Sequence, residues 1–460
     1  MTLPAAGGCW GAAGRGVWGR LRAAGGGGRR DRRDPAGARR RRDAGGAGPG
    51  TDRPQPKAGE RRARPDPFLG PPRADTFPPA HGRDFFWYEL VHQSRRSRAR
   101  VGRIHTPHGV VDTPNFVAVG TNAALKAVDH SLADGLGLQL MFANTYHLLL
   151  QPGPEVVERA GGLHRFMRRD RPIITDSGGF QVFSLSNNSV TDELNRKKSA
   201  GKYRTNSVAK VSEAGVVFRS YRDGRLVELT PERTVRTQKA LGADIIVPLD
   251  ELPPYHIDRA DLKRSVHLSH RWEARSLRTH LADVRRQAMY SVVHGGVDEG
   301  LRKLSAGYLA SLPFDGHAIG GSLGKDVREL VGLLEHVMPL LPPHMPNHLL
   351  GIADEAAVLA TVPLGVDTYD SCFPTRLGRH GTLLTKAGRL QIKSGKHRLD
   401  FRPLEEDCGC PVCRTHSRAY LHHLWKAKEP VVWTYLTLHN LQFMIDLMAR
   451  LRRDILHDRR

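Results

Sequence analysis

Eight short apolar runs between residues 116 and 370 constrain the fold of this chain more than any other feature. Each run is apolar on both faces, and longer stretches with helical periodicity separate them, which is typical of parallel strands covered by helices. Eight such units favour an α/β fold of the (β/α)8 TIM type over an open sheet, and no Gly-x-Gly-x-x-Gly follows the first run. The predicted strands are 116–120, 140–145, 172–176, 244–250, 289–296, 316–321, 348–352 and 365–370. Helices are predicted at about 327–341 and 354–361.

Polar residues stand at the carboxyl ends of these strands, where β/α barrels place their chemistry. Asp176, Asp250 and Asp370 each close one strand, and His294 lies near the end of another. Capping of the following helix would explain one such aspartate. Three of them, followed by Gly-rich turns such as DSGGF, indicate a catalytic pocket. Paired carboxylates suit a reaction at a glycosidic bond, with one as nucleophile and the other as general acid and base.

Three of the five cysteines fall within the six-residue run CGCPVC, at Cys408, Cys410 and Cys413. Thiols this close together are typical of a structural zinc site, which needs a fourth ligand. Chance clustering and a redox pair are the alternatives. The residues alone leave the fourth ligand open among four later histidines, His416, His422, His423 and His439.

The first 83 residues differ in composition from the rest of the chain. They are rich in Gly, Ala, Arg and Pro and carry +11 of the total net charge of +23. Such a segment cannot bury enough apolar surface to fold, so we expect 1–83 to be disordered. Its Arg-rich start fits a mitochondrial or plastid transit peptide as well as a disordered RNA-binding tail, in a chain expected inside the cell. The remaining +12 favours a polyanionic partner such as nucleic acid.

Seven motifs give the chain a family resemblance. They are NTYHL at 144, PGPE at 152, TDSGGFQVFSL at 175, ADIIVPLDE at 243, FDGHAIGGSLG at 314, DSCFPTR at 370, and CGCPVC with a later histidine. In this order, over about residues 86–457, the chain resembles the tRNA-guanine transglycosylases, also called queuine tRNA-ribosyltransferases. The resemblance implies a zinc-bearing β/α barrel that exchanges guanine at the wobble position of tRNA for a 7-deazaguanine base.

The resemblance also implies roles for individual residues. Asp370 stands at the place of the nucleophile, whose attack on the ribose leaves a covalent ribosyl-enzyme, and Asp176 at that of the general acid and base. Asp250 would accept hydrogen bonds from the base, after the nucleotide has flipped out of its stack. The other implied contacts to the base come from Phe180, His294, Gly321, Ser177 and Leu350. Arg376 and Arg379 match positions that hold the tRNA.

The resemblance makes His439 the fourth ligand of one structural zinc, within a helical C-terminal part at 401–460 that follows a barrel at 84–400. Three departures from the family pattern bear on function. His294 replaces a glutamine, and 187–207 reads as an inserted loop. Gly324 stands where bacterial members commonly have valine and eukaryotic ones glycine. Because glycine has no side chain, we expect space here for queuine, whose side arm is bulkier than that of 7-aminomethyl-7-deazaguanine. The smaller base is expected to be the poorer substrate.

A non-catalytic partner subunit is the main alternative, because the family also has accessory paralogues that bind tRNA without turnover. Those paralogues lose the nucleophile or the acid, whereas Asp176 and Asp370 are both present here. A zinc-dependent nucleic-acid-binding module would not need three carboxylates, which repel phosphate. The family resemblance predicts a homodimer or a heterodimer with a related subunit. No apolar run is long enough to cross a membrane.

Overall fold

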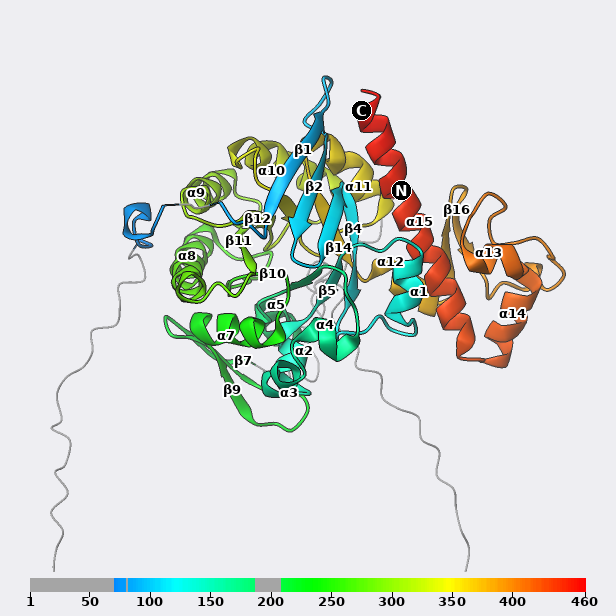
Figure 1. The fold of residues 1–460 in the computed structure, drawn as a ribbon, viewed down its shortest axis with the longest axis horizontal. Helices are drawn as coiled ribbons and strands as arrows, with labels where there is room; N and C mark the ends of the chain where they lie inside the picture. Colours follow the sequence, from blue (N-terminus) through cyan, green and yellow to red (C-terminus); the bar gives the residue numbers. More distant parts are fainter. Residues whose placement is uncertain (1–69, 80–81, 187–207) are drawn as a thin grey trace, which may run out of the picture. The chain divides into compact units, whose positions relative to one another are not determined.

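The computed structural model describes residues 70–79, 82–186 and 208–460 (Figure 1). Eight parallel strands close a barrel in the order β10-β11-β12-β13-β14-β4-β5-β6, in which β6 pairs with β10 and the last barrel strand of the chain, β14, pairs with the first, β4. Each strand overlaps one predicted run, and the predicted barrel is confirmed. The strands are β4 (Asn115–Gly120), β5 (Met141–Ala143), β6 (Ile173–Thr175), β10 (Ile245–Ile246), β11 (Ala288–Val293), β12 (Gly316–Ile319), β13 (Asn347–Leu349) and β14 (Thr368–Ser371).

The strands are apolar on both faces because each face packs against a different cluster. On β4, Val117 and Val119 belong to a cluster that also holds Phe142 and other strand residues. Their neighbours Phe116 and Ala118 belong to a second cluster, which includes residues of the surrounding helices. One face therefore fills the barrel and the other supports the helices, which is the burial that short two-sided apolar runs predict.

Helices cover the barrel from outside (Figure 1). The predicted helix at 327–341 is α10 followed by a short 3-10 turn, η2 (Met338–Leu340), which contains Pro339. The helix predicted at 354–361 is α11, and the Asp354 side chain caps it by accepting from the backbone N–H of Ala357. The helices up to the end of the barrel are α1 (His130–Gly135), α2 (Thr145–Leu150), α3 (Pro154–Arg159), α4 (Leu163–Met167), α5 (Gly179–Ser186), α7 (Pro231–Leu241), α8 (Arg259–Ala282), α9 (Glu299–Ala310), α10 (Val327–Val337), α11 (Glu355–Thr361) and α12 (Phe373–Arg379).

An antiparallel sheet closes the amino-terminal end of the barrel, leaving the carboxyl end of the strands for a site. Its strands are β1 (Trp87–Gln93), β2 (Arg100–Thr106) and β3 (Gly109–Thr113). The Arg100 guanidinium donates to Asp367, which directly precedes β14, at 2.9 Å, and the Tyr88 hydroxyl donates to the same carboxylate at 2.9 Å. A second antiparallel sheet consists of β7 (Val208–Ser212), β8 (Gly215–Arg219) and β9 (Leu226–Leu229).

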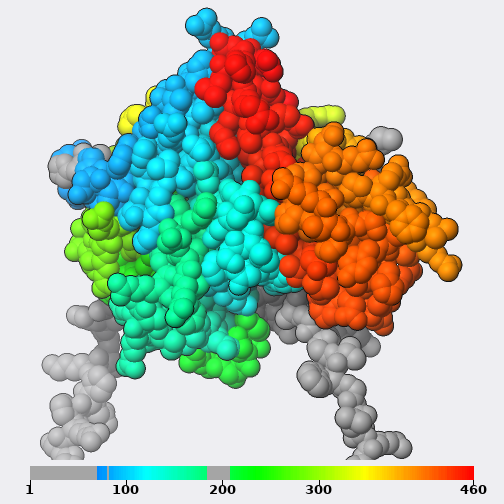
Figure 2. Space-filling model, turned by 45° about the vertical axis from the view of Figure 1, so that its right-hand side comes forward, coloured from blue at the N-terminus to red at the C-terminus, as the bar shows by residue number. Residues whose placement is uncertain are grey.

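The C-terminal elements gather on one side of the molecule, where Figure 2 shows them in orange and red. They are β15 (Thr382–Thr385), β16 (Gly388–Gln391), η4 (Gly395–His397), α13 (Pro411–Thr415), α14 (Arg418–Ala427) and α15 (Val431–Leu456). The long helix α15 packs on α12, and its end lies beside β1, where His92 Nε2 is 3.2 Å from Asp458 Oδ1.

Two sequence predictions fall on residues outside the described part. They are the inserted loop at 187–207 and most of the N-terminal tail. The described segment from residue 70 contains η1 (Ala74–Thr76), and the Tyr308 hydroxyl of α9 donates to the Pro72 carbonyl at 3.0 Å. Among the described helices, none has the length and apolar character needed to cross a membrane.

Candidate active site and metal site

Asp176 follows β6 and lies half-buried at the carboxyl end of the barrel. Its Oδ1 accepts from the Thr145 backbone N–H at 2.8 Å, and its Oδ2 accepts from the Asn144 side-chain amide. Burial, with a smaller contribution from Asp370, raises the pKa of Asp176 to about 7. A carboxyl group with that pKa can both give and take a proton near neutrality.

Asp370 lies on β14, with only 2% of its surface exposed. Its Oδ1 accepts from the Gly351 backbone N–H at 2.8 Å and lies 3.0 Å from Nε2 of His348. Its Oδ2 has no hydrogen-bond partner among the residues that the structure describes. One carboxylate oxygen is therefore fixed, and the other is left for a further atom.

A second group of ionisable side chains lies at the ends of β10 and β11. Burial raises the pKa of Asp250 to about 7. Glu273, fully buried on α8, accepts from the Val292 backbone N–H at 3.0 Å through Oε2. Burial, together with Asp250, raises the pKa of Glu273 well above its usual range. Burial lowers the pKa of His294 to about 3, so its imidazole is neutral near pH 7.

Buried polar atoms without partners concentrate around this group. The Oε1 of Glu273 lies 3.7 Å from Nε2 of His294. Neither atom has a hydrogen-bond partner in the described part of the chain. Folded proteins rarely leave buried polar groups unpaired. The unpaired atoms therefore indicate a site for a polar ligand.

Glycines at the strand ends let neighbouring segments approach closely and form one rim. A Cβ on Gly321 would lie 2.9 Å from the Cβ of His294, and a Cβ on Gly320 would lie 3.0 Å from Cδ1 of Leu350. On the other side, a Cβ on Gly179 would lie 3.1 Å from the carbonyl oxygen of Asp250. The ends of β10 to β13 and the start of α5 therefore meet at the same rim as the two catalytic candidates.

The remaining base-contact candidates lie on this rim too. Phe180 is half-buried at the start of α5. Ser177 is buried, and its Oγ accepts from the Gly179 backbone N–H at 3.2 Å. The structure thus brings the predicted base-pocket residues together at one end of the barrel, while their individual roles stay predictions.

A cationic cluster stands next to the rim. Arg376 and Arg379 are half-buried on α12, and burial lowers the pKa of both. Burial and these two arginines also lower the pKa of Lys126, a residue that the sequence did not single out. Within the described ranges, no carboxylate forms an ion pair with any of the three. Cations without anionic partners suit the phosphates of a nucleic acid.

The position of Gly324 differs from the expectation that its missing side chain leaves space in the base pocket, because the position faces α10. Gly324 has a φ of +98°, in the region that favours glycine, and a Cβ there would lie 2.7 Å from the Cβ of Glu329 on α10. The backbone conformation at this position therefore favours glycine. Space for the side arm of queuine at Gly324 stays a prediction, because a side chain at this position would first contact Glu329 of α10.

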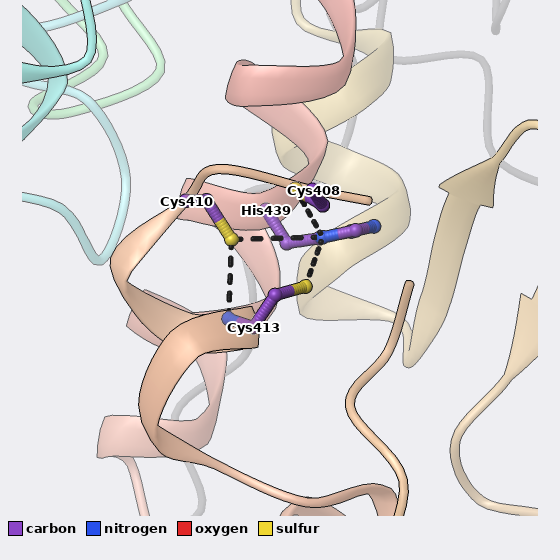
Figure 3. Close-up of side chains that lie close together, drawn as sticks. All are labelled: Cys408, Cys410, Cys413 and His439. Atoms are coloured by element: carbon purple, nitrogen blue, oxygen red, sulfur yellow. Dashed lines mark hydrogen bonds between the residues drawn. The ribbon is translucent and has the colours of Figure 1, made fainter. Parts of the chain in front are cut away.

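The predicted metal ligands converge in the C-terminal part (Figure 3). Cys408, Cys410, Cys413 and His439 place their ligand atoms within 4.8 Å of one another. The Nδ1 atom of His439 lies 3.7, 3.8 and 3.3 Å from the three sulfur atoms, in that order. Tetrahedral zinc would hold such nitrogen and sulfur atoms about 3.6 Å apart. The cluster can therefore hold a metal ion.

A backbone contact fixes which nitrogen of His439 faces the thiols. The Nε2 atom lies 2.9 Å from the carbonyl oxygen of Leu384, which can only accept a hydrogen bond. Nε2 therefore carries the hydrogen, and Nδ1 presents its lone pair to the three cysteines. Such a carbonyl partner is the usual support for a metal-binding histidine.

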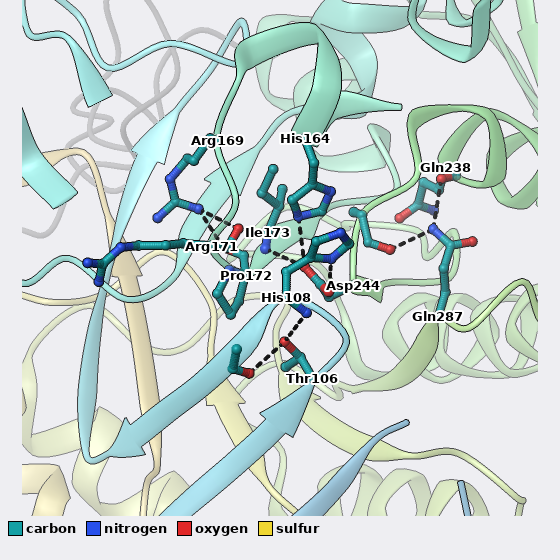
Figure 4. A network of polar contacts seen from close by, with 12 residues as sticks. Thr106, His108, His164, Arg169, Arg171, Pro172, Ile173, Gln238, Asp244 and Gln287 are labelled. Carbon is teal, nitrogen blue, oxygen red and sulfur yellow. Dashed lines mark hydrogen bonds and ion pairs between the residues drawn. The ribbon is translucent and has the colours of Figure 1, made fainter. Parts of the chain in front are cut away.

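A second cluster of possible ligands joins His108, His164 and Asp244 at the other end of the barrel (Figure 4). The imidazole nitrogens lie 2.7 and 3.1 Å from the two carboxylate oxygens, and the rings stack with centroids 3.5 Å apart and planes 11° apart. The in-plane lone pairs of two nearly parallel, stacked rings do not converge on one point, as a shared ion would require. Both histidines instead donate to Asp244, which also accepts from the Ile173 backbone N–H at 2.8 Å.

The fold and the rim define a class: a (β/α)8-barrel enzyme whose two carboxylates, one with a pKa near neutrality, stand at the carboxyl ends of the strands. The sequence profile of the family described as queuine tRNA-ribosyltransferase matches residues 94–460. The queuine tRNA-ribosyltransferase of Protochlamydia amoebophila is 56% identical over 374 residues, which are 81% of this chain and 96% of the relative. Those of Chlamydia muridarum and Chlamydia abortus are 50% and 48% identical over 81% of this chain, and 98% and 99% of their own lengths. The chain belongs to the queuine tRNA-ribosyltransferase family.

Proposed function

We propose that this chain exchanges guanine at the wobble position of tRNA for queuine through a covalent ribosyl-enzyme intermediate. The observation that carries the proposal is the pair Asp176 and Asp370 at one end of the barrel. One carboxyl has a pKa of about 7, and the other has one oxygen fixed and one without a partner. The names of the relatives point to the same activity. A non-catalytic subunit is not favoured, because it would not need this pair.

The chemistry is a double displacement. In the first step, Oδ2 of Asp370 attacks C1′ of the ribose while the bond to guanine breaks, and Asp176 gives its proton to the departing base. In the second step, the incoming base loses a proton to Asp176, its nitrogen attacks C1′, and the bond to Asp370 breaks. One glycosidic bond replaces another, so no nucleotide is consumed.

The unpaired polar atoms of the rim would recognise the base. The Asp250 carboxylate accepts from ring and amino hydrogens, and a neutral His294 donates an N–H to the base carbonyl. Phe180 and Leu350 would flank the base. A site built from such groups discriminates against bases that lack the matching donors or acceptors. Queuine remains the proposed base over 7-aminomethyl-7-deazaguanine.

The tRNA would be held by the cationic cluster. Arg376 and Arg379, with Lys126 beside them, would bind phosphates next to the flipped nucleotide. A dimer, either with a second copy or with a related subunit, is part of the proposal. So is one zinc ion at Cys408, Cys410, Cys413 and His439. All four positions come from the protein, so its role would be structural.

The nucleophile is tested by Asp370→Asn in an assay that follows guanine leaving tRNA. The variant should lose all exchange and form no tRNA adduct that survives a denaturing gel, because an amide cannot form the ribosyl ester. Asp354→Asn is the matched control, since Asp354 also follows a strand but only caps α11, which asparagine does equally well. Exchange at the wild-type rate by Asp370→Asn would refute the mechanism.

The base is tested in the same assay by offering queuine and 7-aminomethyl-7-deazaguanine in parallel. We expect a higher kcat/KM for queuine. Gly324→Val alone does not answer this question, because it strains the loop against Glu329. A higher kcat/KM for the precursor would overturn the choice of queuine while leaving the exchange reaction intact.

A further inference from the structure

A buried histidine contacts the proposed nucleophile, and the sequence did not single it out. His348 lies on β13, the strand that pairs with β14, and has no exposed surface. Its Nε2 is 3.0 Å from Oδ1 of Asp370, and its Nδ1 is 2.8 Å from the Thr368 hydroxyl. The imidazole is therefore held between a hydroxyl and a carboxylate on the neighbouring strand.

The hydrogen-bond chemistry settles which way the contact to Asp370 runs. An ionised carboxylate only accepts hydrogen bonds, so Nε2 of His348 must carry a hydrogen and donate it to Oδ1. The Thr368 hydroxyl has one hydrogen and two neighbours that can take it, Nδ1 of His348 and the Asn347 carbonyl oxygen at 3.0 Å. When the hydroxyl donates to Nδ1, the single hydrogen of the neutral imidazole is on Nε2, which is the tautomer that donates to Asp370.

Two donors then hold the same oxygen of Asp370. The Gly351 N–H reaches Oδ1 from the loop after β13, and His348 reaches it from β13 itself. With Oδ1 occupied twice, the carboxyl group cannot rotate without losing both bonds. The geometry keeps Oδ2 available for bond formation.

We propose that His348 is the positioning residue of Asp370: together with the Gly351 N–H it holds Oδ1 and presents Oδ2 to C1′ of the ribose. The inference rests on the proposed function and deepens it. Because the bond matters most while Oδ2 attacks, loss of His348 lowers kcat for exchange and leaves the KM for tRNA and for the base nearly unchanged.

A neighbouring histidine offers a control for burial alone. His317 lies on β12, next to β13, with 1% of its surface exposed, and its Nδ1 is 2.8 Å from the Ser291 hydroxyl. It has the same chemistry and a similar burial, but among the described residues its hydrogen-bond partner is a serine and not a carboxylate. Replacing it tests the cost of removing a buried imidazole from the barrel.

The experiment compares His348→Leu, His348→Gln and His317→Gln in the exchange assay with wild-type protein. His348→Leu removes the donor and should lower kcat by roughly 10²-fold, the usual effect of losing one fixed donor at a reacting group. His348→Gln keeps an N–H at the place of Nε2 and should recover at least about tenfold of that loss. His317→Gln should retain the wild-type kcat. If a leucine at 348 prevents folding, Thr368→Val, which removes the partner of Nδ1, should still lower kcat with little change in KM.

The results that would overturn the role of His348 differ from the result that would overturn the proposed function. Wild-type kcat in His348→Leu overturns the inference, and so does an equal loss of kcat in all three histidine variants, which would reflect packing alone. A loss that appears in KM instead of kcat also overturns it. Absence of exchange in the wild-type protein would overturn the proposed function, and the positioning role would fall with it.

Discussion

Five aspartates near strand ends have different partners and therefore different roles. Asp354 accepts from a backbone N–H and caps a helix, and Asp244 and Asp367 each bind cations or imidazoles at the amino-terminal end of the barrel. Asp176 and Asp370 lie at the opposite end. Asp176 has a pKa of about 7, and Asp370 has one oxygen held by two contacts and one without a hydrogen-bond partner in the described part of the chain.

The raised pKa of Asp176 predicts the pH dependence of guanine release. Its folded-state pKa of about 7 lies above the ordinary value, so the proton is present below pH 7 and is lost as the pH rises through about 7. Formation of the covalent adduct should therefore slow above pH 7, because the departing base needs that proton. Single-turnover measurements of guanine release from pH 5.5 to 9 check this.

The control for that profile is Asp250→Asn, since Asp250 has a similar pKa but no proposed role in proton transfer. Its residual activity should keep the fall above pH 7, whereas the residual activity of Asp176→Asn should not show it. A fall that persists unchanged in Asp176→Asn would assign the ionisation to another group.

The sequence predicted the carboxylates of the site but not the residues that hold them. Asp176, Asp250 and Asp370 stand at strand ends, a position that the apolar pattern reveals. His348 and Glu273 lie within buried elements, where a histidine or glutamate reads as an ordinary member of a strand or helix. Their partners come from other elements, and one sequence does not show such non-local contacts.

At the scale of elements, the apolar pattern predicted the strands that are buried on both faces. All eight barrel strands were found this way, although β10 (Ile245–Ile246) is much shorter than the run 244–250. The edge sheets β1–β3 and β7–β9 were missed because their strands are partly exposed, with mixed polar and apolar residues such as VAKVS at 208–212. Such strands depend on pairing partners more than on their own composition.

Helix α15 connects the metal site to the cationic cluster. It carries His439, and one residue later the Asn440 side chain donates to the Pro374 carbonyl of α12 at 2.9 Å. The two helices cross so closely that a Cβ on Gly378 would lie 2.9 Å from the backbone nitrogen of Thr437. A shift of α15 must therefore move α12 and its arginines.

Removal of one metal ligand should act on tRNA binding through this connection. Cys410→Ala should abolish bound zinc and lower the Tm by roughly 5 °C or more, since loss of a structural metal is among the largest single-residue effects. The KM for tRNA should rise more than the KM for the base, because α12 carries Arg376 and Arg379. Elemental analysis, thermal unfolding and steady-state kinetics measure the three effects.

His423→Ala is the matched control, because this exposed histidine lies on α14 close to the cysteines in sequence but outside the cluster. It should keep the zinc, the Tm and both KM values. Full activity of Cys410→Ala with no zinc bound would contradict the structural role of the metal.

At the scale of the whole molecule, the relatives separate the chain into two parts. They match 81% of this chain but 96% to 99% of their own lengths, and the family profile begins at residue 94. Every proposed site residue lies after that point. The first 69 residues carry +10 of the net charge of +23, and such a charge can attract tRNA electrostatically.

A chain that begins at Gly70 should keep the kcat for exchange and the Tm of the full chain, because the relatives named for this activity have almost no counterpart of the missing residues.

A chain that begins at Arg83 should instead unfold a few degrees lower. It lacks Phe77, which is 7% exposed under the guanidinium of Arg278, 4.8 Å from its ring centre. Burial of a phenylalanine contributes about 1.5–3 kcal/mol.

Thermal unfolding and exchange kinetics of the three lengths, at low and at physiological salt, measure both effects. A rise in the KM for tRNA that is confined to low salt would identify the first 69 residues as an electrostatic aid to binding. A lower kcat in the chain from Gly70 would show that the catalytic unit extends beyond the part shared with the relatives.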